Sequence, residues 1–243
     1  MDIRARVMSA LRWSAAARFL GQLFSWTVTI LVIRQLSPGD YGLMAMSMVV
    51  VSFLILLNTL GLDAVLVQQK NLPEQARRQI FTLVIVTNLV FFVLLLCAAP
   101  WIADFYGEPR LVLILQVLSL QFPLLIFETL PQSALERDIE FAGRSVVELL
   151  TMVLGSVCTL MLALAGYGVW ALVWGTLVSN TARMIGLNLI CRNLVWPSLS
   201  LQGMARHMTF GGLVSTDRGL WYVFSESDKF IGGKMLGHHQ LGY

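Results

Sequence analysis

Long apolar runs separated by short polar segments make up most of this 243-residue chain. A helix that crosses a membrane needs about 20 mostly apolar residues. Six runs of roughly that length follow one another, at about residues 11–33, 42–67, 80–103, 111–131, 146–165 and 167–190. A seventh run, at about residues 208–233, is more polar. The pattern therefore predicts a series of membrane-spanning segments.

These segments are expected to be helices. Strands of a membrane barrel alternate apolar and polar residues over about 10 positions, whereas the run LVIVTNLVFFVLLLCAAPWIA (83–103) is apolar on all sides. Only 13% of the residues are charged and the mean hydropathy is +0.73, far from the roughly 25% charge of a soluble domain. The first run is too long for a cleaved signal peptide and ends in Arg34, so we expect the amino end to stay attached. The predicted fold class is all-α, a multi-pass transmembrane helical bundle.

Basic residues predict the orientation of these spans, because Lys and Arg in short loops are retained on the cytoplasmic side. Alternate loops, counted from the amino end, hold Arg4, Arg6 and Arg12, then Lys70, Arg77 and Arg78, then Arg137 and Arg144, then Arg192 and Arg206. The opposite loops hold only Arg34 and Arg110 and are very short. The amino terminus is therefore predicted to be cytoplasmic, in the plasma (inner) membrane. This bias accounts for the formal charge of +3, so no nucleic-acid partner is inferred.

Motifs for catalysis or metal binding are missing from the sequence. Cys97, Cys158 and Cys191 are widely spaced in or beside predicted spans, and the adjacent His238 and His239 point to different sides of a helix. The sequence contains neither a GxxxxGK[ST] phosphate loop nor a GxSxG nucleophile motif. We therefore expect no enzyme activity, no cofactor and no metal.

A polar stripe runs along the first predicted helix. Ser14, Arg18, Gln22, Ser25 and Thr29 are spaced 4, 4, 3 and 4 residues apart, which places them on one face of a helix. An arginine at the membrane centre costs about 2.5–3.5 kcal/mol on insertion scales, so it normally faces a protein interior or a hydrated cavity. Alternatively, Arg18 snorkels to the cytoplasmic interface. The deeper polar residues of the stripe favour the cavity.

The chain resembles itself at an offset of 200 residues. Arg18 aligns with Arg218, Ser25 with Ser225, and RQLSPGDYGL (34–43) with KMLGHHQLGY (234–243). The seventh run repeats the stripe, with Ser215, Arg218, Tyr222, Ser225 and Lys229 spaced 3, 4, 3 and 4. Chance similarity in an apolar chain is the alternative, but internal repeats of membrane helices are typical of secondary transporters. We therefore predict a six-helix bundle at residues 1–204 and, at 205–243, the first helix of a second bundle that continues beyond Tyr243.

Several stretches together resemble a known family. They are LSPGDYGLMAM (36–46), LGLDAVLVQ (60–68), AAPWIADFYGEPRL (98–111), LERDIEF (135–141), GYGVWALVWGTL (166–177) and SDKFIGGKMLGHHQLGY (227–243). The chain is similar to the Wzx-like lipid-linked oligosaccharide flippases, in the polysaccharide exporter branch of the multidrug/oligosaccharidyl-lipid/polysaccharide superfamily. It is especially similar to exporters for lipopolysaccharide, colanic acid or succinoglycan. The resemblance implies two six-helix bundles, so this chain departs from the family in its length.

The resemblance implies a function, the export of lipid-linked polysaccharide precursors by alternating access between the two bundles. The implied partners are a polyprenyl diphosphate oligosaccharide, membrane lipids, and a polysaccharide polymerase or chain-length machinery. Sugar hydroxyls and phosphate charges are costly in hydrocarbon unless they are paired. We expect a substrate cavity in which Arg18, Arg218 and Lys229 bind the anionic head group, since arginine grips phosphate oxygens in a bidentate manner. Gln22, Ser25 and Ser225 would form a hydrogen-bonding wall, while the polyprenyl tail stays in the lipid.

Acidic residues within the spans are candidates for ion coupling. A carboxyl group moved out of water has its charged form disfavoured, so it can exchange a proton near neutral pH. The candidates are Asp63, Glu128 and Asp228. The alternative is simple ion pairing, of Asp63, Glu128 and Glu148 with Arg77, Arg78, Arg137 or Arg144, and of Asp228 with Lys229 or Arg218.

Three other functions remain open. A drug or metabolite cation exporter of the same superfamily would share the two-bundle layout, but its cavity is expected to be acidic or apolar. A membrane-bound polymerase or ligase would need reactive groups gathered at the outer face, where the loops are very short. A non-transporting scaffold in polysaccharide assembly is the third possibility.

Overall fold

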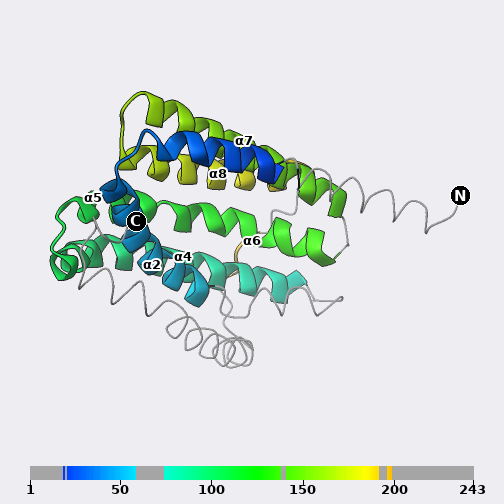
Figure 1. The fold of residues 1–243 in the computed structure, drawn as a ribbon. Helices are drawn as coiled ribbons and strands as arrows, with labels where there is room; N and C mark the ends of the chain where they lie inside the picture. Colours follow the sequence, from blue (N-terminus) through cyan, green and yellow to red (C-terminus); the bar gives the residue numbers. More distant parts are fainter. Residues whose placement is uncertain (1–18, 20, 59–73, 138–140, 192–195, 199–243) are drawn as a thin grey trace, which may run out of the picture.

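The computed structural model describes residue 19 and residues 21–58, 74–137, 141–191 and 196–198. All regular secondary structure in these ranges is helical. A short helix at Gly21–Ile33 carries no label in Figure 1. The labelled helices are α2 (Pro38–Asn58), α4 (Glu74–Tyr106), α5 (Arg110–Leu118), α6 (Gln121–Arg137), α7 (Phe141–Leu164) and α8 (Val169–Ile190). The predicted all-α class is confirmed for this part of the chain.

Four helical stretches are long and apolar enough to cross a membrane. They are Pro38–Asn58, Glu74–Tyr106, Arg110–Leu135 and Gly143–Leu164. Within its described residues, the Gly21–Ile33 helix is shorter than a span. Helix α8 has 22 residues but is more polar than these four, with an arginine and two asparagines in its second half. The chain is thus a multi-pass membrane protein, while the complete six-helix half, its boundary at residue 204 and the helix at 205–243 stay predictions.

The helices run side by side in Figure 1. Helix α7 packs most extensively against α8, and α6 lies between α8 and α4. The Gly21–Ile33 helix, drawn in blue, lies along α7 and α8, and its Val28 and Val32 are buried with Ala163 and Ala171. The main apolar core is formed on the other side, by α2, α4, α5 and the first residues of α6 and α8.

The predicted span at about 111–131 consists of two helices. Helix α5 ends at Leu118, a turn follows at Ser119 and Leu120, and α6 begins at Gln121. Pro123 explains the position of the break, because it has no N–H group for the carbonyl of Ser119 and its ring would clash with that carbonyl in a continuous helix. A second proline, Pro131, lies inside α6.

A single carboxylate joins the first turns of α2 and α8. Asp40 Oδ2 accepts hydrogen bonds from the backbone N–H and the hydroxyl of Ser37, at 3.0 and 2.7 Å, and Ser37 Oγ accepts one from the Asp40 N–H. This is a capping box at the start of α2. The Val169 N–H donates to the other oxygen, Oδ1, at 3.1 Å. Gly168 has φ +55° and a Cβ there would lie 3.1 Å from Asp40 Oδ1, so glycine allows the close approach of the two helix ends.

Candidate functional site

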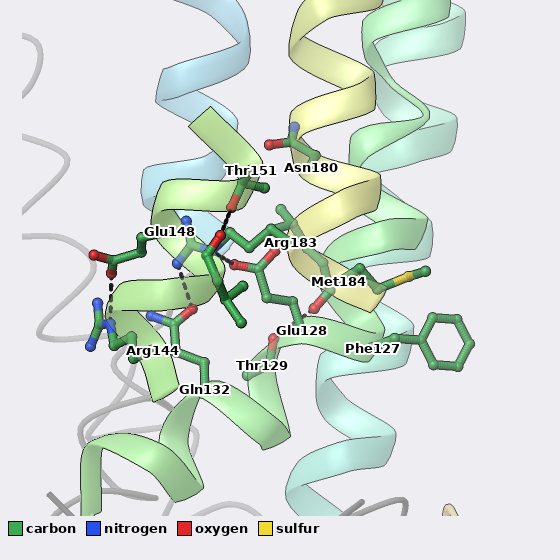
Figure 2. Close-up of polar contacts among 12 residues, drawn as sticks. Phe127, Glu128, Thr129, Gln132, Arg144, Glu148, Thr151, Asn180, Arg183 and Met184 are labelled. Atoms are coloured by element: carbon green, nitrogen blue, oxygen red, sulfur yellow. Dashed lines mark hydrogen bonds and ion pairs between the residues drawn. The ribbon is translucent and has the colours of Figure 1, made fainter. Parts of the chain in front are cut away.

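The most buried charge in the described residues lies between α6 and α8. Glu128 is only 4% exposed, and its Oε1 lies 2.7 Å from Nε of Arg183 on α8. A second nitrogen of the same guanidinium, Nη2, donates to Oε1 of Gln132 at 3.0 Å. Glu128 and Gln132 are four residues apart on α6 and therefore share one face of that helix. Figure 2 shows both side chains directed towards Arg183.

Further polar contacts between α6 and α8 lie on either side of Arg183 along α8. Asn180 Nδ2 lies 3.4 Å from Oε1 of Gln121 at the start of α6. Asn188 Nδ2 donates to the backbone carbonyl of Phe127 at 2.8 Å. The Gln121 amide nitrogen is buried and has no hydrogen-bond partner among the described residues. We call Gln121, Glu128, Gln132, Asn180 and Arg183 the α6–α8 polar cluster.

Electrostatics distinguish this cluster from the other ion pair nearby. The Arg144–Glu148 pair on α7 joins residues one turn apart at 2.8 Å, and both side chains are about one third exposed. In contrast, the Glu128 side chain is 6% exposed and that of Arg183 is 36% exposed. Arg183 therefore presents a partly accessible cation that is held in place by a buried anion. Ionisable side chains within membrane helices mark substrate or ion pathways more often than they support the fold.

A cavity of about 540 Å³ lies between α8, α7, α2 and the Gly21–Ile33 helix. Its lining residues from α7 and α8 are Met152, Gly155, Ser156, Thr159, Leu172, Gly175, Thr176 and Ser179. Those from the other two helices are Val28, Thr29, Val32, Tyr41, Met44, Ala45 and Met48. None of these described residues carries a formal charge.

Two glycines form the wall of this cavity where α7 and α8 are closest. A Cβ at Gly155 would lie 1.8 Å from Ser179 Oγ and 3.1 Å from the carbonyl oxygen of Gly175. A Cβ at Gly175 would lie 1.8 Å from Thr159 Oγ1. Small residues allow membrane helices to approach closely, so these glycines fix the spacing of the two helices that carry the cavity and the polar cluster.

The structure describes only some of the residues predicted to bind substrate. Gln22 is exposed, Ser25 is half-buried and Thr29 lines the cavity. These three share one helix face but are not brought together with the α6–α8 polar cluster. The remaining predicted residues, Arg18, Arg218, Ser225, Lys229, Asp63 and Asp228, lie outside the described residues.

The predicted acid Glu128 is ion-paired, and the partner is new. Pairing was the alternative interpretation, and the sequence suggested Arg77, Arg78, Arg137 or Arg144 as partners. The structure places Arg183 in direct contact with the carboxylate, while Arg144 also attracts it electrostatically. The suggestion for Glu148 agrees with the structure, because Arg144 is its partner.

Arg183, Asn180 and Gln132 were not predicted as site residues, although the sequence of α8 carries a signal for Arg183 and Asn180. Thr176, Asn180 and Arg183 are spaced 4 and 3 residues apart, the same spacing that marks the stripe of the first predicted helix. Among the described residues, no group of three or more His, Cys, Asp or Glu side chains lies close enough to hold a metal ion.

Comparisons with known proteins point to one family. A family sequence model described as "Polysaccharide biosynthesis protein" matches residues 31–243. The succinoglycan biosynthesis transport protein ExoT of Rhizobium meliloti (strain 1021) is 31% identical over 217 residues, which is 89% of this chain and 44% of the relative. The lipopolysaccharide biosynthesis protein WzxC of Escherichia coli (strain K12) is 21% identical over 239 residues, 98% of this chain and 49% of the relative.

A third relative acts, by its name, in teichuronic acid biosynthesis. The teichuronic acid biosynthesis protein TuaB of Bacillus subtilis (strain 168) is 25% identical over 191 residues, 76% of this chain and 40% of the relative. The chain thus spans about half the length of the curated relatives it matches. No solved structure matches the chain.

Proposed function

Because the chain belongs to the polysaccharide biosynthesis protein family, we propose that it acts in a membrane transporter that flips or exports lipid-linked polysaccharide precursors. The observation that carries this proposal is the family match over residues 31–243 in a chain built of membrane-spanning helices. Two relatives support it by name, since one is a succinoglycan transport protein and another acts in lipopolysaccharide biosynthesis. The proposed location is the plasma membrane, with the amino terminus in the cytoplasm.

Alternating access requires two bundles that rock against each other around a central site. This chain spans about half of its relatives, so it would supply one bundle and the first helix of the next. A polyprenyl diphosphate oligosaccharide brings hydroxyl groups and phosphate charges into the membrane, where each needs a partner. Arg18, Arg218 and Lys229 would meet the anionic head group, and Gln22, Ser25 and Ser225 would meet the sugar.

Ion coupling would use carboxyl groups within the spans, with Asp63, Glu128 and Asp228 as candidates. Glu128 has a specific partner, because Arg183 stabilises its charged form at 2.7 Å. If Arg183 moves towards an arriving phosphate group, Glu128 loses that partner and its neutral form becomes favoured. Proton uptake by Glu128 would thereby be linked to substrate binding.

Reconstituted transport by the full-length protein tests this function. The protein is placed in liposomes with a fluorescent lipid-linked oligosaccharide, and the rate of transbilayer movement is measured for the wild type, Arg18→Ala and Arg18→Lys. We expect a strong loss in Arg18→Ala and a partial loss in Arg18→Lys, which keeps the charge but not the bidentate fork.

Other results of this transport assay would contradict either the role of Arg18 or the proposed function. Unchanged rates in both variants would remove Arg18 from the site. If the wild type moves no lipid-linked sugar, the transporter proposal is wrong, and transport of a cationic dye or of nothing at all then separates the cation exporter from the scaffold.

A further inference from the structure

The cavity between α2, α7 and α8 is elongated along the axes of these helices. Helices α2, α7 and α8 each line it with residues at positions i, i+3, i+4 and i+7, starting at Tyr41, Met152 and Leu172. Such a set forms one stripe along a helix face, and seven residues of helix advance by about 10 Å. The cavity is therefore a groove that runs parallel to the membrane-spanning helices for about two helical turns. Its volume of about 540 Å³ is large enough for a small organic ligand.

The groove is chemically suited to hydrocarbon and poorly suited to sugar. Four of its six hydroxyl groups already donate to backbone carbonyls: Thr29 to Ser25 at 2.8 Å, Thr159 to Gly155 at 2.9 Å, Thr176 to Leu172 at 2.9 Å and Ser179 to Thr151 at 3.4 Å. Their donors are thus unavailable to a ligand. The rest of the wall is mainly aliphatic, and it includes Met44, Met48 and Met152, whose flexible side chains adapt to irregular apolar shapes.

Arg183 lies one helical turn beyond one end of the groove. Ser179 lines the groove, and Arg183 lies one turn further along α8. On α7, Met152 of the groove adjoins Thr151, whose carbonyl accepts the Ser179 hydroxyl. Figure 2 shows Thr151 on α7 and Asn180 and Arg183 on the neighbouring helix α8. The last groove residue of α8 thus lies one turn from an arginine whose guanidinium bonds Glu128 and Gln132 on α6. An apolar groove with a cation one helical turn beyond its end fits a ligand with a long hydrocarbon chain and an anionic head group.

We propose that this groove binds the part of an isoprenoid chain next to the phosphates of a lipid-linked substrate, with the diphosphate at Arg183. The proposal rests on the proposed function and replaces the idea that the whole tail stays in bulk lipid. With the amino terminus in the cytoplasm, as proposed above, Arg183 lies in the cytoplasmic half of α8 and the groove extends from it towards the outer face. This is the orientation of a lipid in the inner leaflet, so the groove would load substrate before export.

Photolabelling of the 243-residue chain in nanodiscs tests this proposal directly. The probe is geranylgeranyl diphosphate with a diazirine in the first half of its chain, and labelled peptides are identified by mass spectrometry. We expect labels on α2 and α7 around Met48 and Met152. Unlabelled geranylgeranyl diphosphate should compete about tenfold better than geranylgeraniol, because an arginine–phosphate contact contributes about that factor. It should also compete better than phosphatidylglycerol, which carries a phosphate but has two acyl chains instead of one isoprenoid chain.

Two tryptophan variants on the same helix provide a matched comparison. Met152→Trp fills the groove and should reduce labelling several-fold, whereas Met161→Trp lies on the exposed face of α7, where Met161 is 66% exposed, and should leave labelling unchanged. Met48→Trp fills the groove from α2 and repeats the test if Met152→Trp fails to fold by size-exclusion chromatography. Arg183→Gln should weaken competition by the diphosphate and leave that by geranylgeraniol unchanged.

Three results would overturn the inference: no labelling of groove residues, labelling that phosphatidylglycerol suppresses equally well, or identical labelling in the groove-filling and control variants. The second result would mean that an ordinary membrane lipid fills the groove. The transport assay separates this failure from that of the proposed function. Transport without specific labelling would refute only the proposal that the groove binds the isoprenoid chain. Specific labelling without transport by the full-length protein would refute only the proposed transport function.

Discussion

Removing Arg183 should destabilise the protein more than removing its partner Glu128. The two ends of the 2.7 Å ion pair differ in exposure, with 6% for the Glu128 side chain and 36% for that of Arg183. Arg183→Gln leaves a carboxylate that is almost fully buried without its hydrogen-bonded cation, and only the attraction of Arg144 remains. Glu128→Gln leaves a guanidinium that still bonds Gln132 and reaches a more accessible environment. The asymmetry follows from which charge is stranded.

The expected magnitudes differ by roughly a factor of two or more. Breaking a buried pair so that one charge stays uncompensated costs about 3–5 kcal/mol. We expect Arg183→Gln to lie near the lower end of this range, because Arg144 still attracts the carboxylate. Loss of a charge-assisted hydrogen bond with a partly exposed remaining partner costs about 1.5 kcal/mol, which we expect for Glu128→Gln. The double variant removes the stranded carboxylate, so it should be more stable than Arg183→Gln alone.

The wild type, the two single variants and the double variant form a double-mutant cycle. Their unfolding free energies are measured by SDS titration in mixed detergent micelles at neutral pH. Glu148→Gln is the matched control, because it breaks an ion pair within α7 whose side chains are about one third exposed, and such pairs contribute about 0.5 kcal/mol or less. The reasoning is refuted if Glu128→Gln proves as damaging as Arg183→Gln, or if the double variant shows the sum of the two single losses.

Other predictions concern helix ends, helix spacing and topology. Asp40→Ala removes caps from both α2 and α8 and should lower the unfolding free energy by about 2 kcal/mol, at about 1 kcal/mol per cap; a loss below a quarter of that would show that the caps are not coupled to stability. Gly155→Ala forces a Cβ to 1.8 Å from a side chain of α8 and should cost about 1–3 kcal/mol. In contrast, Gly143→Ala, with its nearest atom at 3.4 Å, should be neutral or stabilising by up to about 1 kcal/mol; equal effects in thermal unfolding would contradict the close α7–α8 contact. In a cysteine-free background, an impermeant maleimide added to intact cells should label Tyr167→Cys and spare Glu74→Cys, and the reverse pattern would invert the proposed topology.

Helix positions were largely predictable because lipid imposes a simple rule. A spanning segment must be apolar and long enough to satisfy its own backbone, so the runs at about 80–103, 111–131 and 146–165 lie within spans of the structure, apart from one residue at the end of the last run. The run at about 42–67 overlaps the span Pro38–Asn58, which begins four residues earlier, and residues 59–67 lie outside the described part of the chain. Features that depend on residues close together in the sequence could also be predicted. Pro123 accounts for the break between α5 and α6, and the spacing of four residues between Arg144 and Glu148 permits their ion pair.

The partner of Glu128 could not be read from the sequence in the same way. Arg183 is 55 residues further along the chain (183 − 128) and meets Glu128 only because α6 packs against α8. Sequence reasoning favoured basic residues in neighbouring loops, whose positions are set by topology alone. A contact between two spans depends on which faces the helices turn to each other, and short-range spacing does not encode that choice.

The fate of Thr29 shows why a polar stripe does not by itself mark a sugar site. Its spacing placed it in the polar stripe that we expected to face a cavity, yet its hydroxyl donates to the Ser25 carbonyl one turn earlier, as serine and threonine often do within helices. The stripe therefore contributes little free polarity to the groove at this position. Glu128 and Arg183 differ because their charges cannot be satisfied within one helix and must be paired between helices. In the described part of this membrane protein, charge paired across α6 and α8 is thus better evidence for a site that binds the polar end of a ligand than hydroxyl groups are. The apolar groove one turn from that charge is the corresponding candidate site for the apolar end of the ligand.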